Sequence, residues 1–570
     1  MKPSVETRLR VPLLSVLLGG LVTLTAVGLV ELIRLITNLA FHGTLSMAET
    51  RPDFSHWGLA GLAVPVVGGL IIGVMARWGS PAIRGHGIPE AMQAIGTADS
   101  RIPARVAILK PLSAAISIGT GGPFGAEGPI IATGGAIGSL LGQWLPSSPV
   151  ERKILLAAGA AAGMTAIFGT PLAAVLLAIE LLLFEFRGRS FLPVALAAGT
   201  AMALRSCFHE PLPMFPLALE HAPNWLTSSG SFVVGAVCGL LAVAVTKLVY
   251  ALEDGFEKLP IHWMWWPALG GIAVGLIGWL DPRTLGVGYD NLRTLLDGHL
   301  ALGAIAALAG LKFLSWWIAL GSGTSGGTLA PLMTIGGACG ALLGHALHGV
   351  PGFEAFPIGL AALIGMAATF AGASRAFLAS VAFAFEATHA THALGPLLLG
   401  CGAAVLVSRV LMRETIMTEK LSRRGVRIPS DYEPDFLHGR HVDAVMEREP
   451  LTVRPQETIA ALASRLSTPG SPWHDVRLVP VTEADGALVA VISRADLFAA
   501  LEAAPASTVL EAGMRHPVSI HPDDDLATAA DRMIFHGIGR LPVVDRSHAP
   551  KLLGLLTRRA ILEARRRHDR

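Results

Sequence analysis

Residues Ile118–Gly142 read IGTGGPFGAEGPIIATGGAIGSLLG, and residues Leu320–Gly344 read LGSGTSGGTLAPLMTIGGACGALLG. At a fixed offset of 202 residues, eleven positions coincide, including Pro129 with Pro331, and most of them are glycines. A straight membrane helix would not be broken by glycine and proline at these places. Such irregular backbone is tolerated at membrane depth only where it is buried in protein or lines a water-filled cavity. Paired broken helices in duplicated halves are typical of transporters and channels.

The same repeat continues beyond the quoted stretches, because Glu180 matches Glu386 once a few residues are inserted. Small-residue packing motifs of membrane helices also resemble each other by composition alone. The recurrence of glycine and proline in one register favours a true duplication. We predict a membrane domain over residues 1–425, with halves of about 1–220 and 225–425.

The composition supports a membrane protein with a soluble C-terminal part. Only 15% of the 570 residues are charged, whereas soluble domains carry about 25%. Residues 431–570 hold 20 of the acidic and 17 of the basic residues. The net charge of +2 argues against a nucleic-acid partner. The four cysteines are widely spaced and favour neither a disulfide framework nor a zinc site; they are Cys207, Cys238, Cys339 and Cys401.

Val11–Val30 is the first predicted membrane helix, because its 20 residues carry no charge and about 20 apolar residues span a bilayer. Lys2, Arg8 and Arg10 precede it. Basic residues favour the cytoplasmic side, so we expect a cytoplasmic N-terminus.

The broken helices can bind an anion without basic side chains. Pro129 and Pro331 suit the first turn of a helix, and the glycines before them leave backbone N–H groups uncovered. A helix N-terminus carries about half a positive charge and free donors, which attract anions. Gly85–Pro89 (GHGIP) has the same design and predicts a third helix end. A cation pathway would instead require grouped acids.

Glu127 is the single acid inside Gly125–Pro129 (GAEGP). A carboxylate beside an anion site is costly unless it has a function. When ionised it can occupy the site as a surrogate anion, and it can leave when protonated, so we predict a gate. The alternatives are a solvent-facing acid or a charge that complements the helix N-terminus.

These motifs resemble the CLC chloride channel/transporter family over roughly residues 10–425. The resemblance implies a homodimer with one anion pathway per subunit, each built from two inverted halves of short, tilted helices. It also implies chloride as the default ion, Glu127 as the gate, and a location in the plasma membrane, the inner membrane in bacteria, with both termini cytoplasmic. The motifs are Gly85–Pro89, Gly125–Pro129, Gly286–Tyr289 (GVGY) and Gly327–Pro331 (GTLAP). By the same resemblance, the anion faces His86, Gly87, Ile88, Ala126, Gly128, Thr328, Leu329 and Met417.

Four of these positions depart from the family pattern. His86 replaces a hydroxyl-bearing serine, Met417 replaces a tyrosine, Ala126 replaces an arginine and Leu329 replaces a phenylalanine. An imidazole can still donate to an anion, and more strongly when charged, although a packing histidine is the alternative. The anion preference therefore remains open between chloride and other small anions.

A further glutamate usually passes protons to the gate in family antiporters, but Leu181 stands at that position. Glu180 precedes it and matches a chiefly structural glutamate of the family, while Glu185 lies too far along for the same route. This favours gated, channel-like conductance. Proton-coupled antiport, with Glu180 as a candidate relay, is the alternative.

A second repeat follows a linker at 426–439. Residues 440–505 and 506–570 each show the order β-α-β-β-α, the second with a basic tail, which resembles a tandem CBS pair in an α+β module. Such pairs in other proteins often bind adenine nucleotides. Ser493, Asp496 and Thr557 are the candidate contacts, and Ala560 stands where the second copy would need an acid. No cofactor is required, and a ligand-free, dimer-supporting pair is the alternative.

Other classes fit less well. A membrane zinc protease needs His-Glu-x-x-His on a helix, but His209-Glu210 is followed by Pro-Leu-Pro, so we expect no enzyme. A divalent-cation transporter would need grouped membrane carboxylates. A purely regulatory sensor would not need Glu127.

Overall fold

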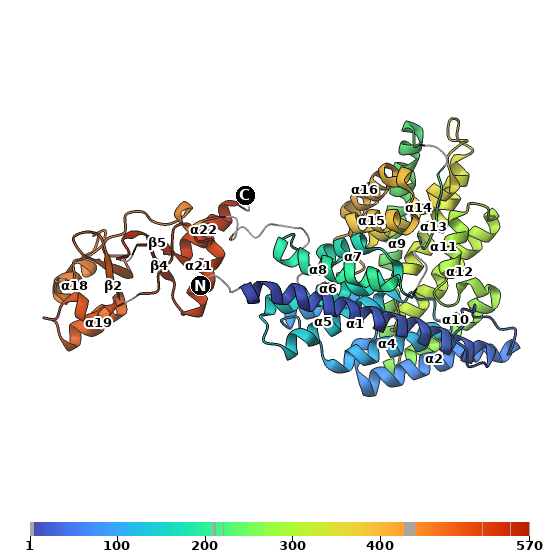
Figure 1. Ribbon diagram of the computed structural model, residues 1–570, viewed down its shortest axis with the longest axis horizontal. Coiled ribbons are helices and arrows are strands. Elements are labelled where there is room, and N and C mark those ends of the chain that lie inside the picture. Colours follow the sequence, from blue (N-terminus) through green and yellow to red (C-terminus); the bar gives the residue numbers. More distant parts are fainter. Residues whose placement is uncertain are drawn as a thin grey trace. The chain divides into compact units, whose positions relative to one another are not determined.

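The computed structural model describes residues 5–208, 213–219, 222–426, 437, 440–515, 517–547 and 549–568. The chain divides into two compact units, Met1–Tyr432 and Glu433–Arg570. We call them the membrane unit, which is helical in its described part, and the C-terminal unit, which combines helices and strands (Figure 1). Lys2, the pair His209-Glu210 and nearly all of the expected linker at 426–439 lie outside the described residues.

The membrane unit contains two runs of helices. The first comprises α1 (Val5–Thr37), α2 (Ala63–Val74), α3 (Ile88–Thr97), α4 (Ala104–Gly119), α5 (Glu127–Trp144), α6 (Pro149–Phe168), α7 (Pro171–Ala178) and α8 (Gly188–Arg205). The second comprises α9 (Trp225–Glu257), α10 (Trp266–Leu280), α11 (Tyr289–Leu296), α12 (Leu302–Gly321), α13 (Leu329–Leu347), α14 (Ile358–Ser374), α15 (Phe377–Thr388), α16 (Leu394–Leu411) and α17 (Glu419–Arg423).

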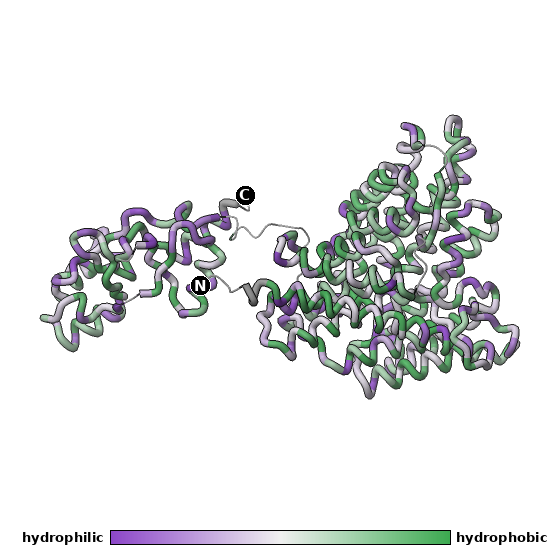
Figure 2. The backbone as a smooth tube through the Cα atoms, in the orientation of Figure 1, coloured by the Kyte–Doolittle hydropathy of each residue, from purple (hydrophilic) through white to green (hydrophobic). Residues whose placement is uncertain are grey.

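The membrane unit contains both long and short helices, as the broken apolar segments predict. Seven helical stretches among the described residues are long and apolar enough to cross a bilayer, whereas α14, α15 and the stretch that contains α7 are shorter. The residues of the membrane unit are largely hydrophobic, whereas hydrophilic and hydrophobic residues are mixed in the C-terminal unit (Figure 2). The prediction of an all-α, multi-pass membrane domain is confirmed.

The sequence repeat appears as matching helix pairs. Helix α4 leads into α5 through the first glycine motif, and α12 leads into α13 through the second. Both α5 and α13 begin two residues before their proline, at Glu127 and Leu329.

The helix that follows packs closely in each case. A side chain on Gly134 of α5 would collide with the carbonyl oxygen of Gly159 on α6, and one on Gly336 of α13 would collide with that of Gly365 on α14. Small residues thus bring backbones together where lipid provides no hydrophobic drive between helices.

The C-terminal unit repeats one order of elements twice, which confirms the predicted α+β module. Each copy places a helix before a two-stranded antiparallel hairpin and a helix after it. The first copy contains α18 (Ile459–Ser467), β1 (Leu478–Thr482), β2 (Leu488–Ser493) and α19 (Arg494–Ala503); the short α20 (Val509–Ala512) and β3 (Met514–Arg515) follow, and β3 extends the first sheet. The second contains α21 (Leu526–Phe535), β4 (Arg540–Val544), β5 (Leu552–Thr557) and α22 (Arg558–His568).

Candidate anion site

The broken-helix motifs meet in the middle of the membrane unit. Gly125 and Gly327 exchange backbone hydrogen bonds, with N–H to O distances of 3.2 and 2.9 Å. The backbone N–H of Gly85 donates to Thr324 at 3.2 Å, which attaches the first motif to the same loop. The beginnings of α3, α5 and α13 are therefore held together, although they are up to 241 residues apart in sequence.

Glycines make this convergence possible. Gly87 has a φ of +94°, and a Cβ there would lie 2.8 Å from the carbonyl oxygen of Gly128. A Cβ on Gly128 would in turn collide with the carbonyl oxygen of His86. Only residues without side chains allow these backbones to approach so closely.

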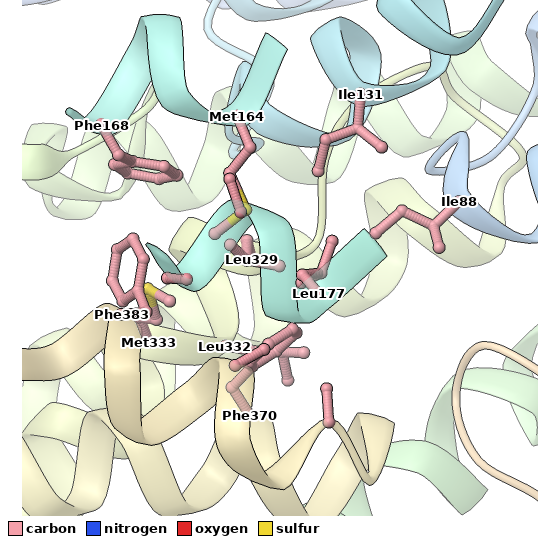
Figure 3. Close-up of a cluster of buried hydrophobic side chains, with 14 of the residues drawn as sticks. Ile88, Ile131, Met164, Phe168, Leu177, Leu329, Leu332, Met333, Phe370 and Phe383 are labelled. Carbon is pink, nitrogen blue, oxygen red and sulfur yellow. The ribbon is translucent and has the colours of Figure 1, made fainter. Parts of the chain in front are cut away.

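The predicted anion-facing positions lie in this region and are buried. Figure 3 shows Ile88 and Leu329 in a cluster of apolar side chains that also includes Phe168 and Phe383, whose ring centroids are 4.7 Å apart. The remaining positions with side chains are also covered: His86, Ala126, Thr328 and Met417.

Glu127 occupies the space between the two broken helices. It is the first residue of α5 and has no exposed surface. A side chain on Gly125 would collide with Oε2 of Glu127, and a Cβ on Gly327 would lie 3.1 Å from the same oxygen. Its other oxygen, Oε1, accepts a hydrogen bond from the Tyr289 hydroxyl at 2.6 Å.

Tyr289 belongs to the motif Gly286–Tyr289, and the sequence pattern did not predict its contact with Glu127. Tyr289 begins α11 directly after Gly288, whose φ is +75°. Its ring lies beside those of Phe168 and Phe215, with centroids 5.8 and 6.0 Å away. These neighbours restrict the ring and thereby aim the hydroxyl at Glu127.

Three polar atoms at the site have no hydrogen-bond partner among the described residues. They are Nδ1 of His86, Oε2 of Glu127 and Oγ1 of Thr328. Buried polar atoms without partners are rare in proteins. Two of the three can donate to an anion, since a hydroxyl and an imidazole nitrogen can each carry a hydrogen.

Met417 is fully buried and offers no donor of its own side chain. The nearby Tyr250 donates its hydroxyl to the backbone oxygen of Ile416 at 2.8 Å. Among the described residues, therefore, no second tyrosine hydroxyl replaces the one that Met417 lacks.

Two buried lysines, which the sequence pattern also did not predict, bind backbone carbonyls of loops in the membrane unit. Lys110 on α4 donates to the carbonyls of Ile83 and Gly85 at 2.8 and 2.7 Å. Lys312 on α12 donates to Thr284 and Gly286 at 3.0 and 2.9 Å. They are 202 residues apart, which is the offset of the repeat. This matching spacing could have indicated that the two lysines have equivalent roles in the two halves. Each holds the loop before a short helix.

Glu180 and Glu386 cap each other's helices across the two halves. Glu180 accepts the N–H groups of Leu378 and Ala379 at the start of α15, both at 2.9 Å. Glu386 accepts those of Leu172 and Ala173 at the start of α7, at 3.0 and 2.8 Å. Both oxygens of Glu180 are thus engaged in a structural bond.

The structure also places the two other residues considered for a proton route, Leu181 and Glu185. Leu181 is buried in the last turn after α7. Glu185 accepts a hydrogen bond from Ser190 at 2.5 Å and lies near Arg187.

Two cavities approach the site. The Glu90 cavity, of about 770 Å³, is lined by Gly87, Glu90 and Lys110, and by Lys420 and Arg423 near the end of the membrane unit. The Tyr289 cavity, of about 1080 Å³, is lined by Ala126, Tyr289 and a set of charged residues. Glu127 is not among the described residues that line either cavity, and its Oε1 accepts the hydrogen bond of Tyr289, which lines the second cavity.

In the C-terminal unit the candidate nucleotide contacts serve as helix caps. Ser493 accepts the N–H of Asp496 at 3.1 Å and donates to its carboxylate at 2.5 Å. Thr557 accepts the N–H of Ala560 at 3.1 Å.

Comparison with known proteins agrees with this architecture. Residues 68–409 match the family described as voltage gated chloride channel, and residues 442–503 and 509–567 match the CBS domain. The chain is 27% identical over 406 residues to a putative chloride channel protein ClcB-like from Ralstonia nicotianae, covering 69% of this chain and 92% of the relative. It is 30% identical over 383 residues to the voltage-gated ClC-type chloride channel ClcB of Citrobacter koseri, covering 65% and 89%.

Solved structures show the same fold. A slow cyanobacterial Cl⁻/H⁺ antiporter matches with a TM-score of 0.66 at 22% identity, covering 73% of this chain and 98% of that one. A eukaryotic CLC transporter matches with a TM-score of 0.63 at 20% identity, covering 98% and 99%. The chain therefore belongs to the CLC family of chloride channels and transporters, as a multi-pass membrane protein that also carries a tandem pair of CBS domains.

Proposed function

We propose that this protein conducts chloride passively through a pathway gated by Glu127. The observation that carries the proposal is the Glu127 carboxylate, buried between Gly125 and Gly327 where two helix N-termini meet. Helix N-termini favour a negative charge at this point. An ionised carboxylate and a chloride ion compete for it, so the pathway opens when the carboxylate leaves.

Tyr289 is the residue that holds the gate shut. Its hydroxyl donates to Oε1 of Glu127, and a hydrogen bond to an ionised group is stronger than one between neutral groups. The Tyr289 cavity adjoins this hydroxyl and gives the released carboxylate a place to go. Protonation weakens the attraction of Glu127 to the helix ends, so conductance rises as the pH falls.

The leucine at position 181, where family antiporters usually carry a second glutamate, supports a channel. Leu181 cannot carry a proton, and both oxygens of Glu180 accept backbone N–H groups. Antiport is the second candidate, because one solved neighbour is a Cl⁻/H⁺ antiporter. Glu90, which lines the other cavity and accepts the N–H of Gly87 at 2.9 Å, is the carboxylate that such a mechanism would use.

The proposed topology places both termini in the cytoplasm of a bacterial inner membrane. The Glu90 cavity is lined by Lys420 and Arg423, near the end of the membrane unit, and we assign this cavity to the cytoplasmic side. Arg34, near the end of α1, lines the Tyr289 cavity instead. Since α1 is long enough to cross the bilayer, the N-terminus returns to the side of the Glu90 cavity. As in the family, the working unit is a homodimer.

The decisive experiment records chloride flux and internal pH together in liposomes that contain purified protein. We expect chloride to move without coupled protons, and Glu127→Gln to conduct faster and without pH dependence. Glu386→Gln, which changes a partly buried carboxylate that caps α7, is the control and keeps the pH dependence. Proton pumping at a fixed ratio to chloride, abolished by Glu127→Gln, would establish the antiporter. Flux without preference between chloride, nitrate and fluoride would refute the assignment of the anion site.

A further inference from the structure

Arg205, the last residue of α8, is a buried cation without a partner among the described residues. Its exposed fraction is 8%, and its guanidinium makes no hydrogen bond or ion pair with any residue that the structure describes; Nε is buried and unsatisfied. Arg205 lines the Tyr289 cavity together with Ala126 and Tyr289. A buried charge without a partner is costly, so this arginine calls for an explanation.

The other arginines of the same cavity provide the contrast. Arg51 and Arg293 both bond Asp290, at 2.9 and 3.2 Å. Arg283 bonds Asp281 at 2.7 Å, and Arg34 bonds Glu31 and Glu49 at 2.8 and 3.0 Å. The remaining acid of the lining, Asp53, accepts hydrogen bonds from Ser55. Every carboxylate of the cavity wall is therefore engaged elsewhere, and Arg205 is left as its uncompensated charge.

The surroundings of Arg205 stabilise a cation but use none of its donors. A Cβ on Gly169 would lie 3.2 Å from Nη1 of Arg205, so the guanidinium sits at the C-terminal end of α6. A helix C-terminus favours a positive charge, which explains how the charge is tolerated. Because no carbonyl accepts from it, the planar fork keeps its five N–H donors.

We propose that Arg205 forms an anion-docking site in the wall of the Tyr289 cavity, which takes a small inorganic anion such as chloride on its way to or from Glu127. This inference rests on the proposed function. Position 126, next to the gate, carries alanine and no charge. Arg205 is thus the group that raises the local concentration of anions at this entrance, as a charge in a low-dielectric cleft does.

Flux in planar bilayers tests the site, with the chloride concentration varied on one face at a time. We expect Arg205→Gln to raise the half-saturating chloride concentration about tenfold on one face only, the effect of losing one charge-assisted hydrogen bond. Arg205→Lys keeps the positive charge but loses the planar guanidinium. We therefore expect its half-saturating chloride concentration to lie between those of wild type and Arg205→Gln. Arg51→Gln, in the same cavity but paired with Asp290, is the matched control and changes the value less than twofold. Equal values for Arg205→Gln and wild type would overturn the proposal.

Equilibrium binding separates this proposal from the gate itself. Calorimetric titration of detergent-purified protein with bromide requires no transport. The site is supported if wild type binds one more anion than Arg205→Gln does, and if Arg205→Lys binds that anion with weaker affinity. This result would hold even if the liposomes do not conduct. If wild type and Arg205→Gln give identical isotherms and Arg205→Gln is only less heat-stable, Arg205 stabilises the end of α6 and binds no anion. That result would overturn the proposal. Absence of chloride flux in wild type would refute the proposed function instead.

Discussion

At the scale of single residues, the proposed gate Glu127 is held by one hydrogen bond between distant parts of the chain. Tyr289→Phe removes the hydroxyl that donates to Glu127 and keeps the ring between Phe168 and Phe215. A hydrogen bond to a charged group contributes about 1.5–3 kcal/mol, and 1.4 kcal/mol is a factor of ten. We therefore expect the open fraction at neutral pH to rise about tenfold, measured as chloride efflux from liposomes, with opening that begins at a higher pH.

Tyr250→Phe is the control for this substitution. It also removes a buried tyrosine hydroxyl, but one that donates to the backbone of Ile416 at 2.8 Å. Both variants lose stability, and only Tyr289→Phe shifts the pH at which conductance begins. If both variants shift it equally, Tyr289 has no special hold on Glu127.

Sequence alone identified Glu127 and missed its partner for a physical reason. The glycines and proline around Glu127 form a local pattern whose chemistry is explicit, because a helix start with uncovered N–H groups binds anions. Tyr289 lies 162 residues away, and its role arises from packing between aromatic rings. No periodicity or spacing encodes such a contact. The same holds for Arg205, whose lack of a partner can be seen only once the cavity is formed.

At the scale of elements, the two halves are joined by reciprocal helix caps. Glu180 caps α15 and Glu386 caps α7, each through two N–H groups. An acid at a helix N-terminus contributes about 0.5–2 kcal/mol. We expect Glu180→Gln and Glu386→Gln to lower the thermal stability by similar amounts, about 1 kcal/mol each, measured by unfolding of the purified protein.

The pair also tests whether Glu180 carries protons. If it did, Glu180→Gln would reduce any proton flux and Glu386→Gln would not, although their helix contacts are alike. Equal behaviour of the two variants in the liposome assay would leave Glu180 a structural residue. A selective loss of proton movement in Glu180→Gln would contradict this reading.

The sequence predicted the presence of helices more accurately than the residues at which they begin and end. The repeat predicted broken helices at Gly125–Pro129 and Gly327–Pro331, and both α5 and α13 begin there. The first helix was predicted over Val11–Val30, but α1 continues to Thr37. Glu31 and Arg34 form an ion pair one turn apart, which lets the helix extend past its apolar stretch. Charged residues that pair along a helix, as these do, interrupt the apolar stretch of the sequence without ending the helix.

At the scale of the whole molecule, the uneven distribution of charge separates two kinds of architecture. The membrane unit uses helix ends, backbone N–H groups and two buried lysines bonded to carbonyls, so an anion route needs few formal charges. The C-terminal unit carries the share of charged residues that is usual in soluble domains. Sequence composition predicted this division. It could not predict that Lys110 and Lys312 face the backbone, since the low charge alone suggested a site without them.

The CBS pair bears on whether nucleotides regulate the molecule. The groups that would hold phosphate and ribose are already committed, because Ser493 caps α19 and bonds Asp496, while Thr557 caps α22. Ala560 provides no carboxylate in the second copy. Binding would have to break a cap worth about 1 kcal/mol and would gain only one acidic contact. We expect millimolar ATP, ADP or AMP to leave the melting temperature of the full-length protein unchanged and chloride flux unaltered. A stabilisation of several degrees by one nucleotide, lost in Asp496→Ala but not in Asp485→Ala at an exposed turn of the same copy, would instead establish a ligand site in the first CBS motif.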